Sequence, residues 1–183
     1  MPAISDEEII KKFKDEQQKE VAFNLLVNKY QERLYWHCRR LVISHDNADD
    51  ALQNTLIKVW KNLEAFRSES GLYTWLFRIA TNESLSLLKS NKRYYSVSDE
   101  LDYESYMAEN LTSDPYFDGD EATLLLQKAI LSLPEKQRVV FNLKYYEELK
   151  YEKMSKILDT SVGALKASYH HAVKKIEKYL KDQ

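Results

Sequence analysis

Hydrophobic side chains recur every three or four residues along most of the first half of the chain, which is the spacing of one helical face. The clearest stripe consists of Phe23, Leu26, Val27, Tyr30, Leu34, Cys38 and Leu41. Before it, Ser5 and Glu8 form a capping-box pair that predicts an N-terminal helix. The SHDN segment (44–47) is expected to end the long helix.

The next helix is expected to begin near Asp49 and Asp50, because acidic residues suit a helix N-terminus. Its inward stripe is expected to be Leu52, Leu56, Val59, Leu63 and Phe66. A fourth helix is expected from about Leu72 to Ser90. Four helices without intervening strands predict a small bundle over residues 1–93.

The helical pattern stops over residues 94–120, where Pro115 and Gly119 interrupt the sequence. About 27 residues without a helical stripe are too many for an inert loop inside one domain, so this segment predicts an extended linker. It nevertheless keeps five tyrosines and a phenylalanine. That aromatic content indicates a segment that lies along another surface.

The helical pattern resumes over residues 121–183. One helix is expected at about 121–133, a second is expected to begin after Pro134, and a short third one is expected at 151–158. Asp159, Thr160 and Ser161 then form a turn, with Ser161 as the N-cap of the last helix. The inward seam of that helix consists of Val162, Leu165, Tyr169, Ala172 and Ile176. A short helix, a tight turn and a longer helix with a cationic outer face predict a helix-turn-helix. The fold class is therefore all-α, with two small helical domains joined by a linker.

Composition agrees with a helical protein, because only three glycines and three prolines occur in 183 residues. The single cysteine, Cys38, excludes an internal disulfide and a cysteine-rich zinc site. We find neither a signal-length apolar run nor a stretch long enough for a membrane span, so we expect a cytoplasmic protein without direct membrane insertion.

The net charge of −2 conceals an uneven distribution along the chain. Residues 1–93 carry 15 lysines and arginines against 13 acidic residues, and residues 128–183 carry 12 against seven. Residues 94–127 carry nine acidic residues and no lysine or arginine. Two mildly basic blocks therefore flank an acidic segment, a pattern that weakly favours nucleic-acid binding.

The segment FRSESGLYTWLFRIATN, residues 66–82, places aromatic side chains beside arginines and an amide. Such groups can stack on unpaired bases and contact phosphates, although a core helix would also use Trp75, Leu76 and Ile79. Catalysis would need a different pattern. The sequence has no Gly-rich phosphate loop and no paired Glu-x-x-His motif, so we expect no enzymatic activity, catalytic residue, cofactor or metal site.

In this order and spacing, four segments resemble the extracytoplasmic-function group of bacterial sigma factors, the promoter-recognition subunits of RNA polymerase. The segments are DNADDALQNTLIKVWKNLEAF (46–66), TWLFRIATN (74–82), LSLPEKQRVVFNLKYYEELKYEKMSKIL (131–158) and SVGALKASYHHAVKKI (161–176). The resemblance implies a non-enzymatic protein whose partners are core RNA polymerase, promoter DNA and an inhibitory anti-sigma factor.

The resemblance implies a role for three sets of residues. Contacts with the polymerase would come from Asp49, Asp50, Gln53, Asn54 and Lys58, although the two aspartates could instead only cap a helix. Binding of melted −10 bases and their phosphates would come from Ser70, Tyr73, Arg78, Asn82 and Lys89. Binding of the −35 duplex would come from Gly163, Lys166, Ser168, His170, His171, Lys174 and Lys175.

The chain departs from the family at Ser168, His171 and Val173, where arginine is common in the family, so the −35 sequence stays open. Two interpretations of the acidic linker also stay open. It could thread through the polymerase as an imitation of a nucleic-acid backbone, or it could be a solubilising spacer. One hypothesis is that it covers the basic faces of the free protein. The rival function is a dimeric helix-turn-helix regulator that binds its operator without polymerase.

Overall fold

The computed structural model describes residues 4–67, 70–94, 107, 109, 111 and 120–182. In these ranges the regular structure is helical and contains no strand, as the sequence predicted. The N-terminal helices are α1 (Asp6–Phe13), α2 (Lys19–Val42), α3 (His45–Asn62) and α4 (Leu72–Tyr94). The C-terminal helices are α6 (Glu121–Leu131), α7 (Glu135–Tyr145), α8 (Tyr151–Leu158) and α9 (Val162–Lys181).

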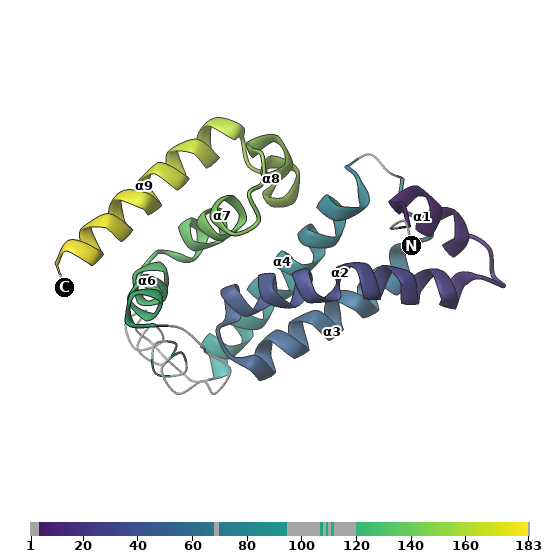
Figure 1. The fold of residues 1–183 in the computed structure, drawn as a ribbon, viewed down its shortest axis with the longest axis horizontal. Helices are drawn as coiled ribbons and strands as arrows, with labels where there is room; N and C mark the ends of the chain where they lie inside the picture. Colours follow the sequence, from purple (N-terminus) through teal and green to yellow (C-terminus); the bar gives the residue numbers. More distant parts are fainter. Residues whose placement is uncertain are drawn as a thin grey trace.

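The first bundle consists of α2, α3 and α4, which pack against one another, with α1 lying on α2 (Figure 1). Ser5 is the N-cap of α1, as expected, because its hydroxyl accepts a hydrogen bond from the Glu8 amide at 3.1 Å. Ile9 and Phe13 of α1 are fully buried in the bundle core. Helix α4 continues to Tyr94, four residues beyond the expected end at Ser90.

Helix α3 begins earlier than the sequence indicated, and this correction concerns the candidate polymerase contacts. Its N-cap is Ser44, whose hydroxyl accepts a hydrogen bond from the Asn47 amide at 3.1 Å. The SHDN segment therefore starts α3 as well as ending α2. Asp49 and Asp50 lie beyond the first turn, so capping does not explain them.

The inward face of α3 also differs from the expected stripe. The buried residues are Ala48, Ala51, Thr55 and Val59, whereas Leu52 and Leu56 are only half-buried. Small side chains let α3 approach its neighbours closely, and the Thr55 hydroxyl is satisfied by the Ala51 carbonyl at 2.7 Å. The larger leucines consequently lie at the edge of the helix contact.

The second bundle contains the predicted helix-turn-helix, formed by α8 and α9 (Figure 1). Asp159 adopts a left-handed conformation at the end of α8, with φ of 50°. The Ser161 hydroxyl then accepts a hydrogen bond from the Ala164 amide at 3.3 Å, which confirms Ser161 as the N-cap of α9. Ala172 and Ile176 of α9 pack with Phe141 of α7 in the core of this bundle.

The two bundles pack directly against each other, through α4 with α8 and α2 with α7. One continuous cluster of buried side chains includes Leu76 and Leu88 from α4 together with Met154, Ile157 and Leu165 from the helix-turn-helix. The helix-turn-helix is therefore held on the first bundle in this conformation.

Most of the expected linker, residues 94–120, lies outside the described residues, including Pro115 and Gly119. Two of its described side chains, Met107 and Leu111, are buried in the same core cluster. At these two positions the segment packs against the protein, in agreement with the expectation that it lies along a surface.

Candidate functional site

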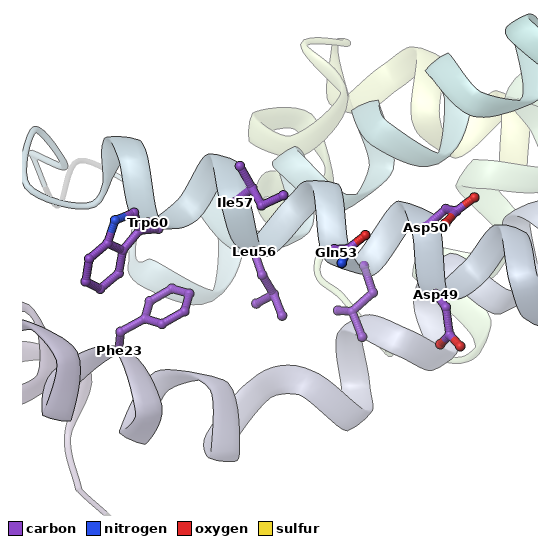
Figure 2. Close-up of a pocket in the computed structure, with 8 residues that line it drawn as sticks. Phe23, Asp49, Asp50, Gln53, Leu56, Ile57 and Trp60 are labelled. Atoms are coloured by element: carbon purple, nitrogen blue, oxygen red, sulfur yellow. The ribbon is translucent and has the colours of Figure 1, made fainter.

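A groove of about 520 Å³ lies between α2 and α3 in the first bundle (Figure 2). Its lining residues are Phe23, Asp49, Asp50, Leu52, Gln53, Leu56, Ile57 and Trp60. Apolar side chains form most of the groove, and the two aspartates lie at one end of it (Figure 2). Ile57 is 46% exposed and Trp60 is 36% exposed. Large apolar side chains that face solvent together indicate a binding surface for another protein.

Aromatic packing holds the Trp60 ring at the other end of the groove. Phe13 and Phe23 lie edge-on to it, with ring centroids 5.3 Å and 5.0 Å away. The Lys19 ammonium lies 5.7 Å from the centre of the Trp60 ring. Trp60 therefore belongs to this groove and is separate from the aromatic stretch over residues 66–82.

The structure brings together only part of the predicted polymerase-binding set. Asp49, Asp50 and Gln53 line the groove, whereas Asn54 and Lys58 are exposed on the adjacent face of α3. The Lys58 ammonium forms an ion pair with the Glu83 carboxylate of α4. Sequence analysis missed the apolar lining residues of α3, which are Leu52, Leu56, Ile57 and Trp60. The sequence did contain a sign of this arrangement. Ala48, Ala51 and Thr55 form a second stripe of small residues at helical spacing, which could be buried instead of the larger apolar residues.

A second, more polar cavity of about 690 Å³ lies at the start of α4. Two predicted −10 residues, Ser70 and Arg78, line it together with Arg67, and Phe66 and Trp75 contribute aromatic rings whose centroids are 5.1 Å apart. The helix-turn-helix closes one side of the cavity with Ser155, Lys156 and Asp159. The cavity thus combines cations with aromatic rings, which suits a nucleotide.

The other predicted −10 residues divide between two faces of α4. Asn82 and Lys89 are exposed, and their spacing of four and eleven residues from Arg78 places all three on one helical face. Tyr73 lies on a different face, where its ring stacks on Phe77 with centroids 4.2 Å apart. Phe77 is fully buried, so this aromatic residue of the stretch belongs to the core.

Tyr73 is half-buried at the contact between the two bundles. Its hydroxyl donates a hydrogen bond to the Glu147 carboxylate at 3.1 Å, and the Arg33 guanidinium lies 4.9 Å from the centre of its ring. Burial, and then the negative charge of Glu147, raise the pKa of Tyr73 above its ordinary value. In this conformation the Tyr73 side chain is not available to an unpaired base.

Helix α9 exposes most of the predicted −35 residues. Gly163 stands in its first turn, and a Cβ atom added there would meet nothing within 4 Å. Exposed polar and cationic side chains follow at Lys166, His170, His171, Lys174 and Lys175. Ser168 differs, because it is half-buried and lines a cleft between the bundles that also contains Leu85.

Among the residues that the structure describes, no three histidine, cysteine, aspartate or glutamate side chains gather in a way that could hold a metal ion. None of the helices in the described ranges is long and apolar enough to cross a membrane.

Family comparisons match both bundles. Residues 26–94 match the model described as Sigma-70 region 2, and residues 123–176 match that described as Sigma-70, region 4. The chain is 32% identical to the ECF RNA polymerase sigma-E factor of Escherichia coli (strain K12) over 181 residues, which cover 95% of this chain and 93% of that protein. It is 32% identical to the sigma-E factor of Haemophilus influenzae over 163 residues, covering 85% and 86%.

A further relative is the ECF RNA polymerase sigma factor SigW of Bacillus subtilis, 29% identical over 168 residues that cover 88% of this chain and 90% of that protein. Two solved structures share the fold. The sigma factor RpoE in complex with the anti-sigma factor NepR from Bartonella quintana has a TM-score of 0.67 and 24% identity, and covers 87% of this chain and 96% of that chain. CnrH in complex with the cytosolic domain of CnrY has a TM-score of 0.69 and 21% identity, and covers 97% and 98%.

Proposed function

The chain belongs to the extracytoplasmic-function family of RNA polymerase sigma factors. We propose which of its surfaces bind the polymerase, the −10 element and the −35 element during transcription initiation. As a sigma factor it binds core RNA polymerase and directs it to promoter DNA. It is an initiation factor and has no enzymatic activity of its own. The assignment of these tasks to particular residues is the proposal.

The groove between α2 and α3 is the docking surface for core polymerase. The observation that carries this assignment is the apolar row formed by half-buried Leu56 and exposed Ile57 and Trp60. The same groove also contains Asp49 and Gln53. An apolar centre supplies binding energy, and polar groups at its edge fix the orientation of the partner. Asp50 also lines the groove, and Asn54 and Lys58 extend this surface over the adjacent face of α3.

The cavity at the start of α4 and the neighbouring helical face hold the melted −10 strand. Ser70 and Arg78 line the cavity, and Asn82 and Lys89 continue along α4. Tyr73 adds a ring for stacking once the second bundle moves away from it. Unstacking a base costs a few kcal/mol, so the cavity must offset that cost with stacking and hydrogen bonds.

Helix α9 contacts the −35 duplex in the major groove. Lys166, His170 and His171 lie within its first half, where base edges come within reach, while Lys174 and Lys175 contact phosphates. Gly163 lets the start of the helix approach the DNA backbone, because the protein itself leaves the space beside it open. Ser168 joins this surface when the cleft it lines opens.

These assignments correspond to three parts of the chain: residues 1–93 for polymerase and the −10 element, 94–120 as linker, and 121–183 for the −35 element. One of the two similar solved structures is a sigma factor bound to the anti-sigma factor NepR, and the other is CnrH bound to the cytosolic domain of CnrY. These complexes support an inhibitory protein partner for this chain as well. Because its polymerase partner acts on the genome, the protein works in the cytoplasm.

Co-elution of purified core polymerase with the chain tests the docking surface directly. Wild-type protein and a Val21→Asp variant should co-elute with the polymerase, since Val21 is exposed on α2 outside the groove. An Ile57→Asp variant should not. Equal co-elution of both variants would contradict the proposed docking surface.

A further inference from the structure

Glu147 lies in the segment after α7, at the contact between the two bundles. Its side chain is only 6% exposed. One carboxylate oxygen accepts a hydrogen bond from the Arg40 guanidinium of α2 at 3.1 Å. The other accepts from the Arg33 guanidinium at 3.2 Å and from the Tyr73 hydroxyl of α4 at 3.1 Å. A single acidic side chain of the second bundle thus binds three groups of the first.

Neighbouring contacts join the same surfaces. The Asn142 amide of α7 donates a hydrogen bond to the Arg40 backbone carbonyl at 3.3 Å. The Arg40 guanidinium lies 4.3 Å from the centre of the Tyr146 ring. Arg40 therefore sits between a carboxylate and an aromatic face, both of which come from the second bundle.

This closed arrangement covers surfaces that the proposed function needs. Glu147 engages the Tyr73 hydroxyl, and α8 closes one side of the cavity beside Ser70 and Arg78. Ser168 of α9 lines the cleft between the bundles rather than the outer face. In this conformation the second bundle therefore occupies part of the α4 surface that the proposed function assigns to the promoter strand.

We propose that Glu147 fastens the two bundles in a closed, autoinhibited state of the free protein, and that binding of polymerase and promoter must break its contacts. The inference rests on the proposed function of α4. Burying a carboxylate costs desolvation energy that its cationic partners must offset, so removing either side of these contacts weakens closure. Phosphate charge brought close to Arg33 and Arg40 competes for the same cations, which links DNA binding to opening.

The physical prediction is a shift between closed and open populations. A partner that binds only the open form has its affinity reduced by the fraction of molecules that are open. A variant that weakens the closed form should therefore bind the polymerase and promoter more tightly, although it makes no new contact with them. Glu147→Gln keeps the size of the side chain and removes its charge. Glu148→Gln is the matched control, because Glu148 is exposed and carries the same charge one residue away.

The test measures the distance between the bundles by electron paramagnetic resonance, with spin labels on Glu20→Cys and Lys178→Cys, which are exposed positions. The buried native Cys38 does not compete for labelling. We expect Glu147→Gln to broaden the distance distribution towards longer values and the control to match wild type. We also expect about three- to tenfold tighter binding of a fork-junction promoter DNA by the variant in the presence of core polymerase.

Arg33→Gln provides a second route to the same result, because Arg33 is more than half exposed and its loss leaves the fold intact. Circular dichroism melting verifies that each variant is folded. Distributions and DNA affinities that match wild type in both variants would overturn the proposal. Failure of the wild-type chain to bind polymerase would instead overturn the proposed function, since the distance measurement does not require polymerase.

Discussion

The His37 Nε2 atom lies 2.9 Å from the Thr81 hydroxyl oxygen in the buried contact between α2 and α4. That hydroxyl donates its own hydrogen bond to the Phe77 carbonyl at 2.7 Å, so it must accept from His37. His37 is therefore the neutral tautomer with its proton on Nε2. Burial, and then the positive charge of Arg40, lower the pKa of His37 from 6.5 to about 3.

This buried histidine predicts a specific pH dependence of stability. Between pH 6.5 and about 3 the unfolded chain binds a proton at His37 and the native protein does not. The free energy of unfolding consequently falls as the pH drops through this window, by at most about 1.4 kcal/mol per pH unit from this group. Above pH 6.5 the contribution is constant.

Urea unfolding at several pH values checks this prediction. A His37→Gln variant keeps an N–H donor for Thr81 and should show a shallower loss of stability below pH 6.5 than wild type. His170→Gln, at an exposed position of α9, serves as the control and should follow the wild-type curve. If the free energy of unfolding fell equally with pH in wild type and His37→Gln, His37 would not be the source of the pH dependence.

Replacing Gly163 by alanine should separate stability from DNA binding. The protein leaves the space beside Gly163 empty, so the added methyl group meets no atom of the chain. Alanine favours a helix over glycine by about 0.5–1 kcal/mol, and the melting temperature should rise slightly. Binding of a −35 duplex, measured by fluorescence anisotropy with polymerase present, should weaken. Unchanged DNA affinity would remove Gly163 from the proposed interface.

The docking groove predicts that a charge at its apolar centre blocks polymerase binding. Ile57→Asp places a carboxylate among Leu56, Trp60 and the existing aspartates. Desolvating that charge should weaken the affinity for core polymerase at least about tenfold, as expected for the centre of an interface. Biolayer interferometry against immobilised core polymerase measures the effect, with Val21→Asp as the control that should bind normally.

Asn82 should contribute to the affinity for DNA with unpaired −10 bases and not to the affinity for fully paired DNA. It is exposed on the same face of α4 as Arg78 and Lys89. In complex with polymerase, Asn82→Ala should weaken binding of a fork-junction DNA with unpaired −10 bases by about fivefold to a hundredfold, or 1–3 kcal/mol per base contact. Binding of a fully paired promoter should change much less. An equal loss on both DNAs would show that Asn82 is not part of the surface that binds melted bases.

Local signals predicted the helices well. The helix-turn-helix followed from Ser161, whose hydroxyl caps α9 as expected, and from the seam that buries Leu165, Ala172 and Ile176. Capping by Ser5 was equally direct. These features depend on residues a few positions apart, where sequence spacing determines geometry.

The face that α3 buries could not be decided from the sequence. Leucines and a small-residue stripe both repeat at helical spacing, and only the distance to α2 and α4 selects Ala51 and Thr55 for the interior. For that reason Leu52 and Leu56, which were expected to be inward, are only half-buried, although Leu52 still packs against the core. The groove, with its exposed Ile57 and Trp60, is a consequence of this choice.

The contact between the two bundles could not be predicted from local sequence spacing either, for a different reason. Glu147 and Arg33 are 114 residues apart, and no sequence spacing relates them. Tyr73 was therefore expected to face DNA, whereas this conformation engages it with Glu147. Charge patterning had indicated basic blocks and an acidic segment, without indicating which acidic side chain would meet which basic one.

The most direct measurement for the account as a whole is run-off transcription with purified bacterial core polymerase and the promoter upstream of the chain's own gene. A discrete transcript should form only when both the chain and the core polymerase are present, and it should be lost with Ile57→Asp. No transcript from a folded chain, together with binding of a palindromic duplex in the absence of polymerase, would contradict this expectation.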